Sequence, residues 1–152
     1  MPETSSLVDD LNSDDNETFY SRLKDQGEDT NVRDQGGFPL LMIAILSDNE
    51  EAARSLIGHP GTDLLLTDRV DGHNAFDSAI HRKNPDLLAT LLENHPGDNI
   101  SLFIQGLLEK HTVVWSNNPN NPDAQACKLV LDEALLSTTI QSNPHSRPRK
   151  TL

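Results

Sequence analysis

The chain has 152 residues, with 24 acidic against 12 basic side chains and a formal net charge of -12 at pH 7. This balance argues against nucleic acid or an anionic membrane as a partner, because Lys and Arg supply most of the affinity for phosphate-bearing surfaces. Aromatic residues make up only 4% of the chain and there is one cysteine, so we expect an aliphatic core and neither an internal disulfide nor a multi-cysteine zinc site.

The N-terminal segment, residues 1–14, is polar and acidic, and we expect a disordered arm because its scattered Leu and Val cannot offset the entropy of ordering. No apolar signal region and no apolar run of membrane-spanning length is present, which favours a cytoplasmic protein. A first helix is predicted over 16–26, where Phe19 and Leu23 share a face and Gly27 stops the helix. It forms a half unit, 15–35.

Two full units follow, 36–71 and 72–100, and each pairs two short helices. The apolar spacing predicts helices over 38–46 and 49–57 in the first unit, and over 74–81 and 85–94 in the second. Asn84 can cap the last of these, with Pro85 at its first position, where the missing N–H costs nothing.

The remaining sequence has a looser pattern. We predict a longer helix over 101–115, a loop rich in Asn and Pro over 116–122, and a last helix that Asp123 caps and that ends near Ser137. Residues 101–137 therefore form a capping unit. The basic tail, 138–152, is expected to be disordered.

An internal repeat relates the two full units. The tract His59-Pro60-Gly61 returns as His95-Pro96-Gly97, thirty-six residues later, and the same offset pairs Gly36 with Gly72 and Asp48 with Asn84. A fixed period of this size is typical of stacked-repeat proteins, which present surfaces to partners. The sequence therefore predicts an all-α, monomeric solenoid with about seven short helices.

Two segments carry a resemblance to a known family. Gly36-Gly37-Phe38-Pro39-Leu40-Leu41-Met42-Ile43 and Gly72-His73-Asn74-Ala75-Phe76-Asp77-Ser78-Ala79 resemble the ankyrin repeat signature, and Gly27 to Gly36 resembles its inter-repeat finger. Tetratricopeptide and HEAT repeats fit less well, since they lack glycine-anchored fingers. The resemblance implies an ankyrin-type helix-turn-helix repeat solenoid over 15–137. It also implies partner binding through finger tips and inner helices, which on this sequence are Arg33, Gln35, Arg69, Asp71, His73, Asp77, His81 and Arg82.

The candidate catalytic and metal-binding residues also fit structural roles. Cys127 could act as a nucleophile with a histidine such as His111, but it shares a helical face with apolar residues, where a free cysteine behaves as a small hydrophobe. Neither the pair His73 and His81 nor the pair of His-Pro-Gly tracts has the spacing of a metal site, and no phosphate-binding glycine loop is present. We therefore expect no catalytic residues, metal or cofactor.

These observations favour a non-enzymatic module that binds a folded protein through finger loops and inner helices. Its role could be that of an adaptor, an inhibitor, or a bacterial effector delivered into the cytosol of a host cell. The alternative is a cysteine-dependent enzyme that uses Cys127 with a histidine.

Overall fold

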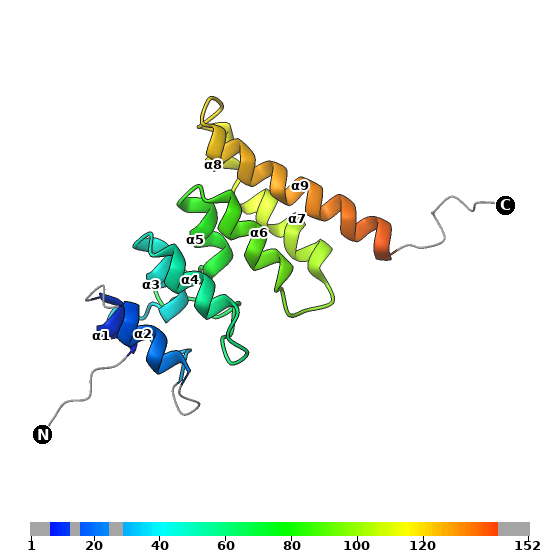
Figure 1. Cartoon of the computed structure of the whole chain (residues 1–152). Helices are drawn as coiled ribbons and strands as arrows, with labels where there is room; N and C mark the ends of the chain where they lie inside the picture. Colours follow the sequence, from blue (N-terminus) through cyan, green and yellow to red (C-terminus); the bar gives the residue numbers. More distant parts are fainter. Residues whose placement is uncertain (1–6, 13–15, 25–28, 143–152) are drawn as a thin grey trace, which may run out of the picture. The chain divides into compact units, whose positions relative to one another are not determined.

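The computed structural model describes residues 7–12, 16–24 and 29–142, with the side chains of 139–142 left out of the description. Within these ranges the chain forms nine helices and no β-strand, so the predicted all-α class is confirmed (Figure 1). None of these helices has the length and apolar character needed to cross a membrane. The chain divides into two compact units, Met1–Arg82 (unit 1) and Lys83–Leu152 (unit 2).

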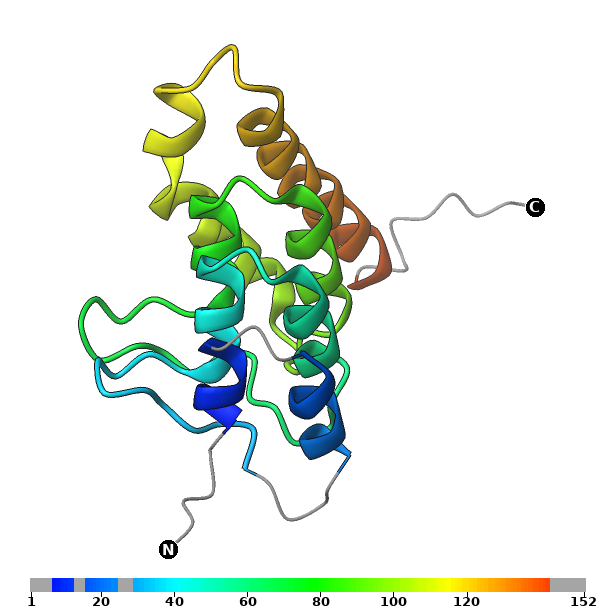
Figure 2. The same ribbon diagram turned by 60° about the vertical axis from the view of Figure 1, so that its left-hand side comes forward.

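Unit 1 contains five helices in two rows: α1 (Leu7–Asn12), α2 (Asn16–Leu23), α3 (Leu40–Leu46), α4 (Glu50–Ile57) and α5 (Ala75–His81). Helices α1, α3 and α5 follow one another in the first row, and α2 and α4 form the second (Figure 2). Each of the pairs α1–α2 and α3–α4 is a helical hairpin across the two rows.

The hairpin of α3 and α4 follows directly from its sequence. Every residue of α3 is apolar, as suits a helix with neighbours on several sides. Helix α4 is amphipathic, and the Asn49 side chain caps it by accepting the backbone N–H of Ala52 at 3.2 Å. Leu40, Leu56 and Phe76 are all fully buried in unit 1.

Unit 2 contains α6 (Pro85–Glu93), α7 (Ile100–Lys110), α8 (Thr112–Ser116) and α9 (Pro122–Ser142), and α9 packs against the other three. As predicted, the Asn84 side chain caps α6 by accepting from the backbone N–H of Leu87, and proline occupies the first turn.

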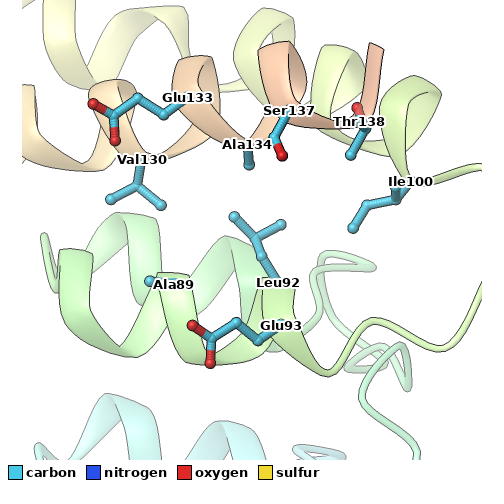
Figure 3. A pocket seen from close by; sticks show the side chains of 9 residues that line it. All are labelled: Ala89, Leu92, Glu93, Ile100, Val130, Glu133, Ala134, Ser137 and Thr138. Carbon is cyan, nitrogen blue, oxygen red and sulfur yellow. The ribbon is translucent and has the colours of Figure 1, made fainter. Parts of the chain in front are cut away.

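A groove of about 570 Å³ runs between α6, the first residue of α7 and the second half of α9 (Figure 3). Leu92 and Ile100 contribute to it from α6 and α7, and Val130 and Ala134 face them from α9. This groove lies entirely within unit 2.

The expectation of a disordered arm over residues 1–14 is wrong for residues 7–12, which form α1. Leu7 and Leu11, one helical turn apart, are 1% and 3% exposed. Their burial stabilises this helix although the segment also contains acidic residues. Asp10 forms an ion pair with Arg22 of α2 at 2.8 Å. Residues 1–6, 13 and 14 lie outside the described ranges.

The C-terminal helices also differ from the prediction. The helix expected over 101–115 is divided at His111, whose side chain is buried: α7 ends at Lys110 and α8 begins at Thr112. Asn121, rather than Asp123, caps α9, because its side chain accepts the N–H groups of Asp123 and Ala124. Helix α9 continues to Ser142, so the expected disorder of 138–152 is wrong for its first five residues.

The left-handed turns repeat at thirty-five residues and not at the thirty-six that the His-Pro-Gly tracts indicated. The left-handed residues Gly37 and Gly72 are thirty-five apart, and so are Asp48 and Lys83, which have φ of 61° and 55°. Helix α6 is one residue longer than α4, so the extra residue enters only at the end of the second helix. The boundary between the two units also falls inside the predicted unit 72–100.

Candidate functional site

Two loops of unit 1 contain most of the predicted binding residues. Finger 1 is residues 29–39, before α3, and finger 2 is residues 58–74, between α4 and α5. In finger 1 the Asp34 carboxylate accepts the backbone N–H groups of Gly36 and Phe38 at 3.0 and 2.9 Å. Gly37 has φ of 88°, a conformation that favours glycine, so the chain can turn there without strain.

Finger 2 is organised around a buried carboxylate. Asp68 is 4% exposed, and its Oδ1 accepts the N–H groups of Val70, Asp71 and Gly72 at 2.8, 2.6 and 3.2 Å. Burial alone would raise the pKa of Asp68, but bonds from backbone N–H groups, including that of His73, outweigh it and lower the pKa. The turn is therefore built on an ionised side chain.

Arg33 joins the two fingers. Its Nη1 donates to the carbonyl of Gly37 in its own finger at 2.9 Å and to the carbonyl of Thr67 in finger 2 at 2.6 Å. A Cβ atom on Gly37 would lie 2.9 Å from Cβ of Arg69, which shows how closely the two backbones approach. Arg33 thus braces the loops.

A second set of bonds joins the same loops nearer to α4. The Asn31 side chain donates to the carbonyl of Gly61 at 2.9 Å and accepts the N–H of Asp63 at 2.8 Å. The hydroxyl of Thr62 donates to that of Thr30 at 3.1 Å. Each finger is therefore held by its neighbour as well as by its own turn.

Exposed side chains remain at the outer ends of these loops and at the end of α5. Of the eight predicted binding residues, five are exposed: Gln35, Arg69, Asp71, His81 and Arg82. His73 is half-buried, and its ring centroid lies 5.4 Å from that of His81. The structure therefore brings together two histidines that are eight residues apart in the sequence.

Asp77 is a correction to the predicted set. It is 1% exposed, and its carboxylate accepts the N–H of Asn74 at 2.9 Å, while the Asn74 side chain caps α5 in return. This reciprocal arrangement is a capping box, so Asp77 stabilises the start of the helix and cannot contact a partner. Arg33 likewise acts as a brace, since its Nη1 donates to the carbonyls of Gly37 and Thr67 within the two fingers.

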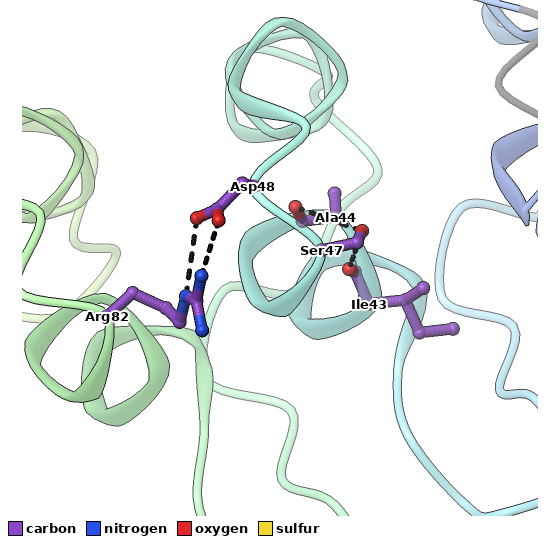
Figure 4. A network of polar contacts seen from close by, with 5 residues as sticks. All are labelled: Ile43, Ala44, Ser47, Asp48 and Arg82. Atoms are coloured by element: carbon purple, nitrogen blue, oxygen red, sulfur yellow. Dashed lines mark hydrogen bonds and ion pairs between the residues drawn. The ribbon is translucent and has the colours of Figure 1, made fainter.

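Arg82 reaches back to the turn after α3. Its guanidinium donates two bonds to the carboxylate of Asp48, while the nearby Ser47 hydroxyl donates to the carbonyl of Ile43 (Figure 4). Both charged side chains are well exposed, so the pair is a surface contact that joins the ends of α3 and α5. Arg82 is exposed but engaged.

Three of these side chains offer atoms that could ligate a metal. Within the described residues, one ligand atom from each of Asp68, Asp71 and His73 lies within 4.8 Å of the others. However, Oδ1 of Asp68 already accepts three backbone N–H groups. The turn geometry alone accounts for the proximity of these side chains, and we do not propose a metal site here.

The other two histidines of interest have a local role. The Nδ1 atoms of His59 and His95 accept the N–H groups of Gly61 and Gly97 at 3.0 and 3.1 Å, so each ring stabilises its own His-Pro-Gly turn. Burial against Phe103 lowers the pKa of His95. The matched tracts thus repeat a turn.

Cys127 lies on the buried side of α9 with Ala124 and Leu131, and all three are 0% exposed. Burial, and secondarily the charge of Asp123, raises the pKa of the Cys127 thiol to about 12, although Lys83 acts in the opposite direction. A nucleophilic cysteine needs an accessible thiolate, and this environment suppresses it.

Val70 is a residue of this surface that the sequence analysis missed. It lies at the tip of finger 2 between Arg69 and Asp71 and is 66% exposed. The sequence signal for Val70 is that it is an apolar residue in an otherwise polar turn, whereas the resemblance to the ankyrin repeat implies only its charged neighbours as binding residues.

Comparison with known proteins gives no relative for this chain. No model of a protein family, no curated protein and no solved structure matches it.

Proposed function

We propose that this chain is a non-enzymatic interaction module of the ankyrin-repeat type, which binds a folded protein partner through the tips of fingers 1 and 2. The contacting residues are Gln35, Arg69, Val70, Asp71, His73 and His81. Arg33 and Asp77 act as supports, and Arg82 contributes at the edge of the surface.

The arrangement in unit 1 supports the ankyrin-like part of the proposal. Helical hairpins lie beside one another, and a loop with a left-handed glycine precedes both α3 and α5. Ankyrin repeats have a period of about thirty-three residues. The period of thirty-five residues found for the left-handed turns is closer to this value than the period of thirty-six suggested by the His-Pro-Gly tracts.

The observation that carries the proposal is the set of hydrogen bonds between the fingers. Arg33 and Asn31 tie finger 1 to three backbone groups of finger 2. A loop that is already ordered loses less entropy when it binds, so more of its contact energy becomes affinity. Surface loops fixed by a scaffold are a common place for binding residues.

The chemistry of the tips suits a protein surface of mixed character. Arg69 and Asp71 offer opposite charges on either side of the apolar Val70, and Gln35 can both donate and accept. A uniformly charged ligand would meet one repulsive group here, whereas a folded protein can supply complementary charges around an apolar contact.

The alternative of a cysteine-dependent enzyme loses its main support. At the pKa of about 12 assigned to Cys127, only a very small fraction of the thiol is ionised near neutral pH. We infer a cytoplasmic, monomeric adaptor, inhibitor or effector.

The proposal can be tested by photo-crosslinking in the cells that produce the chain. A photoreactive amino acid replaces Val70 in one variant and Val113 of α8 in a matched control, since these valines are 66% and 63% exposed. We expect a discrete adduct from position 70 alone, with the partner identified by mass spectrometry.

A charge variant separates specific capture from chance contact. Arg69→Glu combined with His73→Ala should remove the adduct at position 70, whereas Arg54→Glu on α4 should leave it unchanged, since separate surface positions couple weakly. Equal adducts from positions 70 and 113, or loss of the adduct with Arg54→Glu alone, would place the binding surface elsewhere.

A further inference from the structure

Helix α9 is apolar on more sides than its own unit covers. Ala124, Cys127 and Leu131 are fully buried and account for its packing in unit 2. Yet Leu129 and Leu136 are 55% and 63% exposed. An exposed helix face normally carries polar residues, so exposed leucines on one helix point to a contact outside the unit.

The exposed leucines adjoin the groove between α6 and α9. Leu129, Glu133 and Leu136 follow an i, i+4, i+7 pattern and so share one stripe of the helix. Glu133 also lines the groove, and Val130 and Ala134 lie on the adjacent stripe that faces it. The leucine stripe therefore adjoins the groove along α9.

The sides of the groove across from each other are acidic. Glu93 of α6 and Glu133 of α9 are both exposed and both line the groove, and no basic side chain does (Figure 3). Among the described residues, neither carboxylate takes part in a salt bridge. An occupant would thus meet an apolar surface with a negative charge on each helix.

We propose that this groove binds a cationic amphipathic helix from a partner protein. Apolar side chains of that helix would lie along Val130 and Ala134, which are one helical turn apart on α9, and against Leu92 of α6. Lysine or arginine side chains beside its apolar face would pair with Glu93 and Glu133.

Charge decides between this occupant and a second copy of the chain. A second copy carries the same net charge of -12 and would bring its own glutamates to the contact, which is repulsive. A basic helix removes that repulsion and covers the exposed leucines at the same time. The site lies in unit 2 and is independent of the fingers of unit 1.

The experiment uses the full chain and a defined probe. A fluorescent Leu/Lys peptide of about 18 residues, patterned as an amphipathic helix, is titrated by anisotropy beside a Leu/Glu peptide of the same apolar pattern. We expect saturable binding of one Leu/Lys peptide per chain and none of the Leu/Glu peptide. Failure of the Leu/Lys peptide to bind overturns the proposal.

Two substitutions locate the binding. Glu133→Lys should weaken it by about tenfold or more, whereas Glu109→Lys, an equal charge change on α7 outside the groove, should alter it by less than about twofold. Ala134→Trp, which fills the groove without changing charge, should abolish it. An equal effect of the two lysine variants, or unchanged binding with Ala134→Trp, would mean that the peptide binds by nonspecific charge attraction and not in the groove. Either result overturns the proposal.

Sedimentation of the unliganded chain tests the other occupant. We expect a single species whose mass does not depend on concentration. A dimer that Ala134→Trp dissociates would show that a second copy fills the groove, and the proposal would then be wrong. Because the probe binding does not involve the fingers, its failure leaves the proposed function of unit 1 untouched.

Discussion

Unit 1 and unit 2 are both built from packed helices, but their surfaces are held in place by different interactions. In unit 1 the proposed binding surface is formed by the loops of fingers 1 and 2. Ionised or polar side chains such as Asp68, Arg33 and Asn31 hold the backbone of these loops. In unit 2 the groove is lined mainly by the long helix α9, which is held by the buried Cys127 and Leu131.

The difference determines what each surface can recognise. Hydrogen bonds have fixed directions, so they place individual side chains such as Arg69 and Val70 at defined points of a loop. Apolar packing has no direction, and a helix held in this way can keep spare apolar side chains such as Leu136. The first arrangement suits a specific folded surface, and the second suits a helix in a groove.

The largest expected effect concerns the apolar packing of unit 2. If Cys127 is buried with a pKa of about 12, against an ordinary value of 9.0, its thiolate fraction near pH 8 falls by about a thousandfold. Iodoacetamide should therefore modify the native chain at least about a thousand times more slowly than the chain in urea. Mass spectrometry of the alkylated protein over time measures the ratio.

The same group gives a pH dependence with a definite sign. Because the folded pKa is raised, the unfolded thiol loses its proton first, so stability declines as pH rises above 9.0 towards about 12. Cys127→Ala should remove this decline. In the iodoacetamide experiment, an alkylation rate of the native chain within about tenfold of the rate in urea would contradict the burial of the thiol.

The carboxylate of finger 2 tests the hydrogen-bonded surface of unit 1. Asp68→Ala should lower the free energy of unfolding by about 2–4 kcal/mol, because it leaves several backbone N–H groups without their charged acceptor. Asp71→Ala, at an exposed position in the same turn, should cost less than about 0.5 kcal/mol. Urea unfolding measures both.

Lowering the pH gives a second test of the role of the Asp68 carboxylate. The folded pKa of Asp68 lies below 3.8, so its stabilisation is complete above that pH and is lost as the pH falls through the lowered value. The stability difference between the native chain and Asp68→Ala should hold near neutral pH and shrink in strong acid. A difference that grows on acidification would mean that the carboxylate is not the acceptor.

Two glycines in equivalent turns separate backbone conformation from close approach. Gly72→Ala places a Cβ in open space at φ of 73°, and should cost about 1 kcal/mol. Gly37→Ala has the same left-handed cost and also forces its Cβ to within 2.9 Å of Cβ of Arg69, so we expect about 2–3 kcal/mol. Equal costs would show that the fingers are not packed against each other.

The smallest effect is expected for the ion pair of Arg82 and Asp48. Both side chains are well exposed, at 41% and 63%, so Arg82→Ala should cost less than about 1 kcal/mol, and added salt should reduce this cost because it screens the two charges. Thermal unfolding at two salt concentrations checks it. A loss well above this size would make the pair a main support of the α3–α5 contact.

The sequence predicted the features of the fold that depend on neighbouring residues. The cap at Asn84 and the start at Pro85 could be predicted because a cap involves only the next three residues. Helix α1 was missed because its stability comes from contacts with α2 and α3, including the pair of Asp10 with Arg22. An acidic six-residue segment shows no such partner in its own sequence.

The repeat phase and the binding residues show the same limit. The His-Pro-Gly tracts predict a period of thirty-six residues, because a fixed offset between the two units cannot show that α6 is one residue longer than α4. Asp77 was assigned to the binding surface because its position on α5 was read from the family, whereas the capping box that buries it depends on Asn74. The bond from Arg33 to Thr67 spans thirty-four residues and could not be inferred locally.

Hydrogen–deuterium exchange on the free chain tests most directly the claim that the fingers are preformed. The amides of Val70 and Asp71 are bound to the Asp68 carboxylate, and that of Phe38 to Asp34, although they lie in loops at the surface. We expect them to exchange at least about tenfold more slowly than in an unstructured peptide. Exchange at the unstructured rate would show that the fingers become ordered only on binding, and would contradict the account.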